Sequence, residues 1–339
     1  MISIDGSRGE GGGQILRTAL ALSLATGAPF RIERIRAQRK KPGLMRQHLT
    51  AVQAAVAIGR AAVEGAAIGS GALTFTPNGV EPGDYAFAVG SAGSATLVLQ
   101  TVLPPLLLAS GRTQLTLEGG THNPWAPPFD FLATVVLPIV NRLGPRVETT
   151  LTRAGFYPAG GGRFTVTIEP ARRLDRLELL DRGAITARRV RAIVANLPRH
   201  IGEREVTKAL GVLNWSEDCG HVEIVDSAVS GPGNIVFVEL EAEHATEICT
   251  GFGEAGTPAE TVAERAAKDA LRYLAANVPV GVHLADQLLP ILSLGQGGSF
   301  RTVALSRHTQ TNADVVRQFL DVTIRVTDEG RGVIRVDVG

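Results

Sequence analysis

The stretch SFRTVALSRHTQTN, residues 299–312, decides the fold that the sequence predicts. In residues 300–305, side chains at even positions would face one side of a strand and those at odd positions the other. Some of them are β-branched, and the pattern predicts a strand. Thr311 and Asn312 precede apolar residues and are good N-caps, so a helix is expected from there onward. His308 is then expected in the turn between strand and helix, where amide donors attract anions and an imidazole is a candidate nucleophile. The alternative interpretation is a solvated loop histidine.

Two earlier segments of the chain repeat the order of elements around this stretch. Each has a glycine turn, a helix, a strand, a polar loop, a second helix and two strands. The copies cover residues 1–80 and 87–170, and a third begins near residue 280. Three βαβαββ units of such length predict an α+β fold made of α/β repeats, not a solenoid of short repeats.

Residues 183–277 break this period and predict a smaller inserted α+β domain. Residues 1–182 and 278–339 would then form one large catalytic domain of three repeats. The elements expected in the three copies are helices at 14–25, 46–58, 96–108, 130–142, 284–292 and 312–320, strands at 1–4, 30–35, 114–117, 164–168 and 300–305, and a hairpin at 322–326 and 332–338. Those expected in the insert are strands at 187–195, 221–226 and 235–240, and helices at 201–213 and 259–275. No catalytic constellation is visible in the insert, so a structural or substrate-docking role is expected for it.

Composition limits the classes of function. The 34 Lys and Arg against 33 Asp and Glu leave a net charge of +1, so a nucleic-acid contact would need a local basic patch. Cys219 and Cys249 have no metal-ligand spacing, which argues against a structural zinc site and suits a reducing compartment. Residues 1–15 do not resemble a signal sequence, and the apolar run at 97–108 is too short to span a bilayer. A soluble cytoplasmic protein with no membrane contact is expected.

The equivalent polar loops of the three copies are residues 36–46, 119–128 and 306–311. Repeated units packed about a common axis bring such loops together. One loop is basic, one is rich in Asn, Pro and Gly, and one carries the histidine. This combination favours a cleft for polyanions, although a repeat alone also suits a purely structural protein.

The glycine turn GEGGGQ, residues 9–14, opens the first helix. Glycines there let backbone amides approach a ligand closely. The turn matches neither of the common nucleotide motifs, and a simple tight turn also explains it. Glu10 places a carboxylate beside this predicted phosphate site, which makes it a candidate ligand for a divalent cation that bridges phosphates.

A basic run follows, with seven Lys and Arg residues between positions 31 and 46, and Gln47 comes directly after it. Such a run is often a solvated surface, but the arginine fork is suited to phosphate. Arg17 lies within the apolar part of the first helix and needs an anionic partner or a route to water. Asp286 lies near the start of the helix that precedes the His308 strand. It either orients the imidazole or caps a helix.

Together these motifs resemble the RNA 3'-terminal phosphate cyclase family. The matching stretches are GEGGGQILR at 9–17, KPGL at 41–44, RQHL at 46–49, GSAGS at 90–94 through LQ at 99–100, GT at 120–121 with NP at 123–124 and APP at 126–128, GFYPAGGG at 155–162, ADQ at 285–287, and His308 with Thr311 and Asn312. They span the whole chain. The insert resembles the family only in its placement and in PRH at 198–200.

The resemblance implies a ligase that uses ATP and a divalent cation, Mg or Mn, to convert an RNA 3'-phosphate end into a 2',3'-cyclic phosphate. It implies a histidine-AMP intermediate, then an RNA-phosphate-AMP intermediate, with release of pyrophosphate and AMP. It also implies three repeats resembling the C-terminal domain of a translation initiation factor, distantly similar to enolpyruvyl transferases. Oligomeric state stays open, with a homodimer among the options.

The resemblance also assigns roles to individual residues. His308 would be the nucleophile, assisted by Asp286 and Arg17, and Glu10 would hold the metal. Phosphate-binding positions are matched by Arg17, Arg36, Arg39 and Gln47, and the ATP pocket by Gln100, Pro127, His283, Leu284, Ala285, Asp286 and Gln287. His283 would stack on adenine.

Two other classes of function are consistent with parts of the sequence. One branch of the family is non-catalytic and serves ribosome assembly, but that branch lacks the histidine that this chain has at position 308. An enolpyruvyl transferase would need neither a histidine-AMP nor an RNA-directed basic surface, and no motif favours it.

Overall fold

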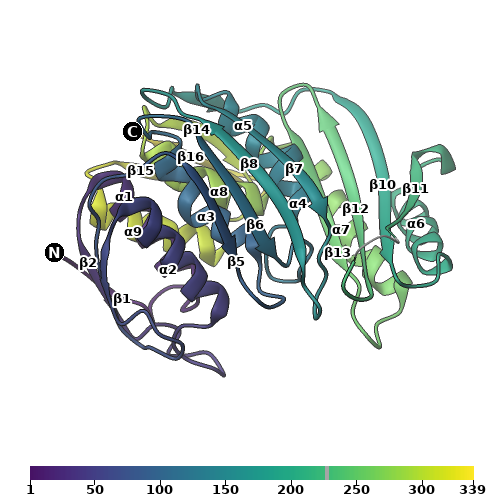
Figure 1. Ribbon diagram of the computed structural model, residues 1–339. Coiled ribbons are helices and arrows are strands. Elements are labelled where there is room, and N and C mark those ends of the chain that lie inside the picture. Colours follow the sequence, from purple (N-terminus) through teal and green to yellow (C-terminus); the bar gives the residue numbers. More distant parts are fainter. Residues whose placement is uncertain (226–228) are drawn as a thin grey trace.

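The computed structural model of this chain describes residues 1–225 and 229–339. These residues form four-stranded sheets with helices packed on them, and each sheet contains both parallel and antiparallel pairs. Figure 1 shows three of the sheets gathered around a group of helices and the fourth, in green, at one side. The expectation of an α+β fold is confirmed at this level.

The first sheet contains the N-terminus. Its strands in spatial order are β1 (Ile2–Asp5), β2 (Phe30–Glu33), β4 (Leu73–Thr76) and β3 (Ala62–Glu64). β1 and β2 are parallel, and α1 (Gln14–Thr26) joins them, while α2 (Arg46–Gly59) leads from β2 to β3. Both helices begin where the sequence predicts, because an apolar stripe defines each of them.

The second sheet has the same arrangement. Its strands in spatial order are β5 (Asp84–Ala88), β6 (Thr113–Gly119), β8 (Gly162–Glu169) and β7 (Arg146–Arg153). α3 (Ala95–Leu106) joins β5 to the parallel β6. The helix expected at 130–142 is divided into α4 (Phe129–Phe131), a π-helical turn η1 (Leu132–Val136) and α5 (Leu137–Asn141). Pro138 explains the break, since it has no N–H for the α-helical ladder.

The third sheet brings together distant parts of the chain. Its strands in spatial order are β9 (Leu177–Leu179), β14 (Gly298–Thr302), β16 (Val333–Val338) and β15 (Ile324–Gly330). Its helices are α8 (Val282–Ser293) and α9 (Arg307–Phe319). β9 pairs in parallel with β14, so the expectation that this unit begins near residue 280 is wrong. β9 was missed because three residues are too few to show an alternating pattern.

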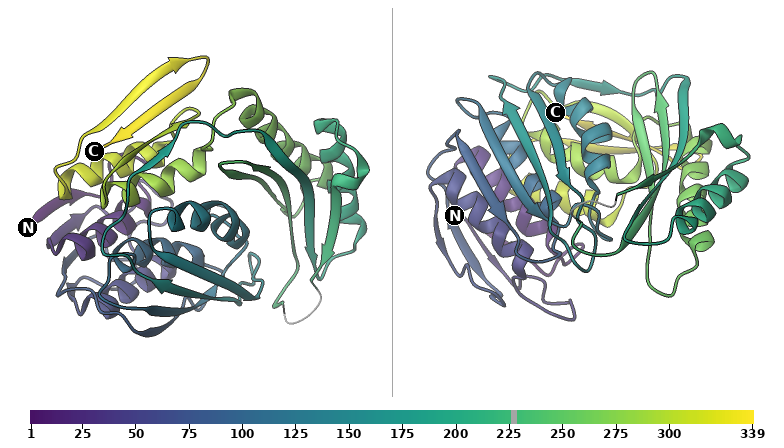
Figure 2. Two further views of the ribbon diagram at one scale, coloured as in Figure 1. Left: turned by 90° about the horizontal axis from the view of Figure 1, so that it is seen from above. Right: turned by 45° about the vertical axis from the view of Figure 1, so that its right-hand side comes forward.

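The fourth sheet is formed by the segment between β9 and α8. Its strands in spatial order are β11 (Gly220–Ile224), β10 (Ile185–Ala195), β12 (Gly233–Ala242) and β13 (Thr246–Phe252). α6 (His200–Leu213), the short η2 (Glu217–Cys219) and α7 (Ala259–Ala276) complete it. β13 was not predicted, and Asp226 of the expected strand 221–226 lies outside the described residues. Both views in Figure 2 place this segment to one side of the other sheets.

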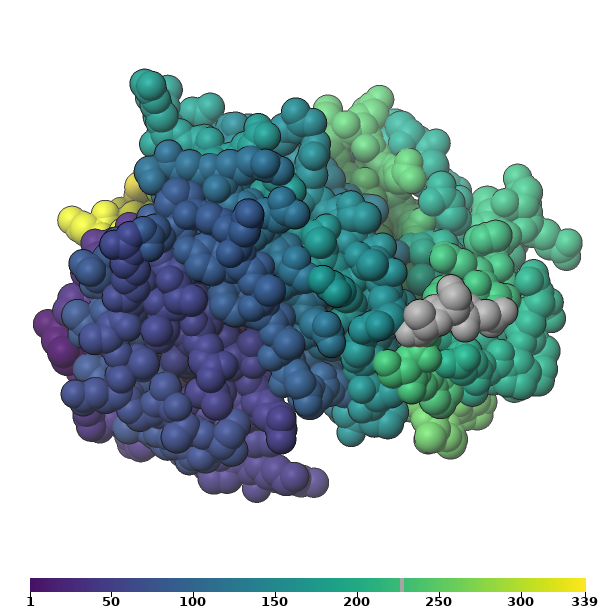
Figure 3. All heavy atoms as spheres, viewed as in Figure 1, coloured from purple at the N-terminus to yellow at the C-terminus, as the bar shows by residue number. Residues whose placement is uncertain are grey.

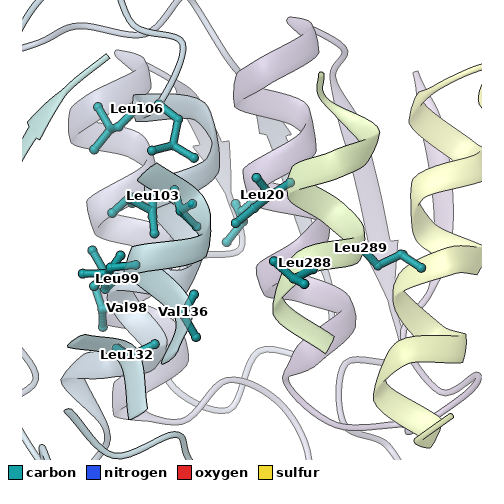
Figure 4. Close-up of a cluster of buried hydrophobic side chains, with 14 of the residues drawn as sticks. Leu20, Val98, Leu99, Leu103, Leu106, Leu132, Val136, Leu288 and Leu289 are labelled. Atoms are coloured by element: carbon teal, nitrogen blue, oxygen red, sulfur yellow. The ribbon is translucent and has the colours of Figure 1, made fainter. Parts of the chain in front are cut away.

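The hydrophobic core lies between the helices of the first three sheets. Figure 4 shows Leu20 of α1, Leu99 of α3 and Leu288 of α8 within one buried cluster, next to Leu132 of the π-helical turn. Burying a leucine contributes roughly 1.5–3 kcal/mol. A second cluster holds α6 and α7 against β10 and β12. Across residues 1–225 and 229–339, no helix is long and apolar enough to cross a membrane.

Candidate active site

The glycine turn before α1 is crowded by charged and polar side chains. A Cβ added at Gly13 would collide with the His48 ring and lie 2.9 Å from a guanidinium nitrogen of Arg17. A Cβ at Gly12 would meet the Glu10 carboxylate and lie 2.8 Å from a guanidinium nitrogen of Arg39. Side chains from α1, α2 and the basic loop therefore converge on this turn, and only glycine leaves room for them.

Arg17 is a buried cation, with only 8% of its surface exposed. Its Nη2 donates a hydrogen bond of 2.5 Å to Oε1 of Gln14, whereas its Nε has no hydrogen-bond partner within residues 1–225 and 229–339. Among the described residues, no carboxylate lies within 4.0 Å of the guanidinium. Burial lowers the pKa of Arg17 to about 10, which still leaves it charged near neutral pH. The charge of Glu10 offsets part of this desolvation, and an anion bound from outside would offset more of it.

Arg17 lines a small cavity between α1, α3 and α8. The cavity has a volume of about 40 Å³, and Gln100, Asp286 and Gln287 also line it. Nε2 of Gln100 donates to Oε1 of Gln287 over 2.7 Å. The structure thus brings together four of the predicted site residues from three helices that are far apart in sequence.

A larger cavity of about 820 Å³ lies against the start of α2. Arg36, Arg46, Gln47 and His48 line it, together with parts of the turn before α3. Oε1 of Gln47 accepts the N–H of Ser94, the N-cap of α3, at 3.1 Å. Figure 3 shows the surface hollowed between the N-terminal part of the chain, in purple and blue, and the teal segments beside it.

The basic run divides into two groups. Arg31 pairs with Glu33 and Arg34 with Asp5 on the exposed surface, which fits the interpretation of a solvated face for these two. Arg36 turns inward instead, and its Nη1 donates to the carbonyl oxygens of residues 41 and 43 at 2.8 and 2.9 Å. Partial burial, with the charge of Arg39 nearby, lowers the pKa of Arg36. The inward part of the run is therefore concentrated at the large cavity.

Glu10 contacts the basic loop and α9. Its carboxylate forms an ion pair with Arg39 and accepts the N–H of Gly12 at 2.8 Å. Its own N–H donates to Oγ1 of Thr311 at 2.9 Å. No group of three His, Cys, Asp or Glu side chains within the described ranges could hold a metal ion. A single carboxylate fits an ion held mainly by water and by substrate phosphates, as Mg²⁺ commonly is.

The helix that carries His308 starts earlier than the sequence predicts. α9 begins at Arg307 with Ser306 as its N-cap, whose hydroxyl accepts the N–H of Thr309 at 3.0 Å, so Thr311 and Asn312 are not caps. Thr311 instead bonds to the glycine turn and Asn312 to α1. These are tertiary contacts, which local sequence propensity does not predict. His308 lies in the first turn of α9, not in a preceding loop, and its Nδ1 has no hydrogen-bond partner among the described residues.

Asp286 ties the start of α9 to α8. Its Oδ1 accepts hydrogen bonds from the hydroxyls of Ser306, at 2.5 Å, and of Thr309. These residues flank His308 in sequence, and no hydrogen bond joins Asp286 to His308 in the described part of the chain. Asp286 thus fixes the helical turn that presents the imidazole and does not hold the ring itself.

Asn312 links the same turn to α1. Its Oδ1 accepts from Nε2 of Gln14 at 3.0 Å and from the hydroxyl of Thr18 at 2.7 Å. Its Nδ2 donates to the backbone oxygen of Asp286 at 2.8 Å. Because Gln14 also accepts from Arg17, a continuous set of hydrogen bonds connects the buried guanidinium to the turn that holds His308.

The other residues predicted for the ATP pocket are more scattered. Leu284 and Ala285 are buried in the core and do not line either of the two cavities described above. His283 is exposed, and its ring meets Phe131 edge to face at 6.5 Å. The carbonyl oxygen of Pro127 accepts the Thr96 hydroxyl at 2.8 Å.

His48 is a site residue that sequence reasoning missed, although it stands in the RQHL motif. It is buried, and its Nδ1 accepts the N–H of Met45 at 3.1 Å. Burial, helped by the charges of Arg17 and Arg36, lowers the pKa of His48 to about 3. The ring is therefore neutral near pH 7, and its Nε2–H faces Gly13 as a hydrogen-bond donor.

A sequence model of the RNA 3'-terminal phosphate cyclase family matches residues 8–326. The chain belongs to this family. An RNA 3'-terminal phosphate cyclase of Koribacter versatilis (strain Ellin345) is 52% identical over 97% of this chain and 92% of its own length. One of Ralstonia nicotianae is 49% identical over 99% of this chain and 97% of its own length. The resemblance carried by the motifs, and the expectation of an enzyme of this family, are confirmed.

One solved structure, the enolpyruvyl transferase NikO from Streptomyces tendae, aligns with 96% of this chain and 46% of that chain. Its sequence identity is 13% and its TM-score is 0.37, which is too low to bear on either the fold or the function.

Proposed function

We propose that this cyclase-family chain uses ATP to convert the 3'-terminal phosphate of RNA into a 2',3'-cyclic phosphate. The observation that carries the proposal is the buried guanidinium of Arg17, which has no carboxylate within 4.0 Å in the part of the chain that the structure describes and is connected by hydrogen bonds to the turn that holds His308. A phosphate group is the anion that an arginine fork binds best. The reaction is inferred from membership of the family, and the position of its phosphates is inferred from the geometry around Arg17.

The reaction would run in three displacement steps, each of them at a phosphorus atom. The His308 imidazole attacks the α-phosphorus of ATP, forms a P–N bond and releases pyrophosphate. A terminal phosphate oxygen of the RNA then attacks the same phosphorus and frees the histidine. The ribose 2'-hydroxyl finally attacks the RNA phosphorus, loses its proton, closes the ring and releases AMP. Activation turns an unreactive dianion into an electrophile, and the neighbouring hydroxyl reacts at a high effective molarity.

The residues around the glycine turn would hold the charged groups during these transfers. Arg17, Arg36 and Arg39 would bind phosphate oxygens, and Gln47 and the neutral His48 would donate or accept hydrogen bonds beside them. A divalent cation, Mg or Mn, would be held by Glu10 and by phosphate oxygens, and it would neutralise charge on those phosphates.

The ATP pocket would include Gln100, Pro127, His283, Asp286 and Gln287. The cavity at Gln100 and Gln287 has room for only a few water molecules, at about 40 Å³, whereas a bound nucleotide needs several hundred. We therefore infer that ATP enters by separating Gln100 from Gln287. The neighbouring cavity of about 820 Å³ is large enough for the end of an RNA chain.

The architecture around this site also suggests a history of duplication. We infer that residues 1–182 and 278–339 form one domain of three βαβαββ repeats, of the kind found in the translation initiation factor C-terminal domain, and that 183–277 form an inserted domain. Support comes from the strand order, which is the same in the first three sheets. If the strands of each sheet are numbered along the chain, their spatial order is first, second, fourth and third.

The test is intact-mass analysis of the protein after incubation with ATP and Mg²⁺ or Mn²⁺. We expect the mass of one AMP to be added to the unsubstituted chain and none to His308→Ala, with both proteins equally folded by circular dichroism. His221→Ala, which changes an exposed histidine of β11, is the matched control and should accept AMP normally. An AMP adduct on His308→Ala would show that another residue is the nucleophile.

A further inference from the structure

Two large aromatic side chains stand on the surface beside the candidate site. Trp125 is 86% exposed and Tyr157 is 56% exposed. Their ring centroids lie 6.3 Å apart with the planes at 78°, so the edge of one ring meets the face of the other. Such a contact covers at most one face of the indole, and the other face is open. Indole is the side chain that gains most from burial, so its exposure calls for an explanation by function.

The loops that carry this pair are firmly held. Residues 121 and 122 both donate their N–H to the carbonyl oxygen of Gly155, at 2.9 and 3.0 Å, which joins the two loops to each other. The His122 ring bonds to Asp130 at 2.8 Å, and Nδ2 of Asn123 donates to the carbonyl oxygen of Ala92. Trp125 itself has a left-handed backbone with φ of 66°, which is rare for a bulky residue. The ring is thus displayed by a defined structure and not by a loose loop.

The loops that carry the pair reach the turn that lines the larger cavity. Residue 160 packs so closely on the turn before α3 that a Cβ there would lie 2.7 Å from Cα of Ala92 and 2.9 Å from the carbonyl oxygen of Ser91. Ser91 belongs to the lining of the large cavity, as do Arg36 and Arg46. The two loops that carry the rings therefore lie against the turn that lines this cavity, and the charged side chains of its lining are arginines.

We propose that Trp125 and Tyr157 form a stacking platform for a nucleobase of the RNA whose 3'-phosphate enters the large cavity. The proposal rests on the proposed function. A positive groove for the backbone with exposed aromatic rings beside it is how proteins bind single-stranded nucleic acid without reading its sequence. Two rings offer far less area than the roughly 800 Å² that each partner buries in a stable protein interface, so a base is the better match.

The test measures RNA use and ATP use separately. We expect Trp125→Ala to raise the KM for a 3'-phosphorylated RNA pentamer by about 5- to 150-fold, the range that loss of one stacked base gives. Trp125→Phe, which keeps a ring, should recover most of the loss. Adenylylation of the protein by ATP alone should stay within twofold of that of the unsubstituted chain. Val326→Ala, an exposed apolar change on β15, is the control for a surface substitution.

A second arm identifies the stacked base. Pentamers with one abasic ribose at each of the three 3'-terminal positions are compared on the unsubstituted protein and on Trp125→Ala. At one position the abasic change should cost as much as Trp125→Ala, and the two losses should not add. Fully additive losses at every position, or an unchanged KM for Trp125→Ala, would overturn the platform. Impaired adenylylation by ATP alone would assign the rings to adenine instead, and absence of any adduct on the unsubstituted chain would refute the proposed function itself.

Discussion

Arg17→Met should make the protein more stable and less active at the same time. The guanidinium is buried, and burial lowers its pKa from the usual arginine range to about 10, which corresponds to a penalty of about 3 kcal/mol on the charged form in the folded state. This penalty applies at every pH below about 10, because the unfolded chain keeps the proton more tightly. Methionine has a similar reach and no charge. Against the gain stands the lost hydrogen bond to Gln14, worth about 1.5–3 kcal/mol because its donor is charged, so we expect a net stabilisation of about 0–1.5 kcal/mol.

The loss of function should be large. A charged contact to phosphate contributes about 1.5–3 kcal/mol, so kcat/KM for ATP or for the RNA end should fall by about 10- to 150-fold. ATP should also stop protecting the variant against unfolding, since ligand-linked stability disappears with affinity.

Urea unfolding followed by circular dichroism gives the stability, and the rate of AMP attachment gives the activity. Arg8→Met is the matched control, because the Arg8 side chain is 86% exposed, and it should change stability by no more than about 0.5 kcal/mol. If Arg17→Met unfolds more easily than the unsubstituted protein, the guanidinium is a structural partner and the argument from an unpaired charge fails. Full activity would equally remove Arg17 from the phosphate site.

Two further predictions concern the buried carboxyl of α6 and the last chemical step. Burial raises the pKa of Glu205 to about 8, so the folded state keeps a proton that the unfolded state loses above about pH 4.5, and stability should fall as pH rises between these values. The free energy of unfolding of Glu205→Gln, measured in urea, should therefore exceed that of the unsubstituted protein by about 3 kcal/mol at pH 7 and equal it near pH 4.5. Parallel curves of unfolding free energy against pH for the two proteins would contradict this. An RNA with a 2'-deoxy, 3'-phosphorylated end should accept AMP and accumulate as the adenylylated strand on gels, whereas a 3'-hydroxyl end should not be cyclised; no capped strand beside normal cyclisation of the ribose control would argue for a direct route.

Much of the fold follows from local sequence patterns. α1 and α2 could be predicted because their apolar stripes follow the helical period and Gly27 ends α1 with a left-handed residue. β9 and β13 could not, since their identity depends on pairing with other strands. The start of α9 was misplaced because Ser306, Thr311 and Asn312 are all good caps locally. Tertiary hydrogen bonds decide among them.

The candidate site shows the same division. Arg17 could be singled out because an arginine within an apolar helix needs an explanation. His48 could not, because nothing in the sequence shows that its ring faces the glycine turn. The hydrogen-bond partners of Asp286 could not be predicted either, because they depend on tertiary packing. The carboxylate bonds to Ser306 and Thr309 at the start of α9 and not to the imidazole.

The pairing of β9 with β14 has a consequence for the order in which the protein forms during synthesis. Leu177 pairs with Gly298, so a strand made early must wait for its neighbour while the whole fourth sheet is translated. At about 5–20 residues per second this delay is roughly 6–24 seconds. The first two sheets and the intervening segment contain their own strand partners and can form during that time. α9, which carries His308, is synthesised almost last. Its contacts with Glu10 and Gln14 join the two ends of the chain. If the proposed function holds, a nascent chain released early would contain the basic residues of the large cavity but not His308, so it could not form the histidine-AMP intermediate.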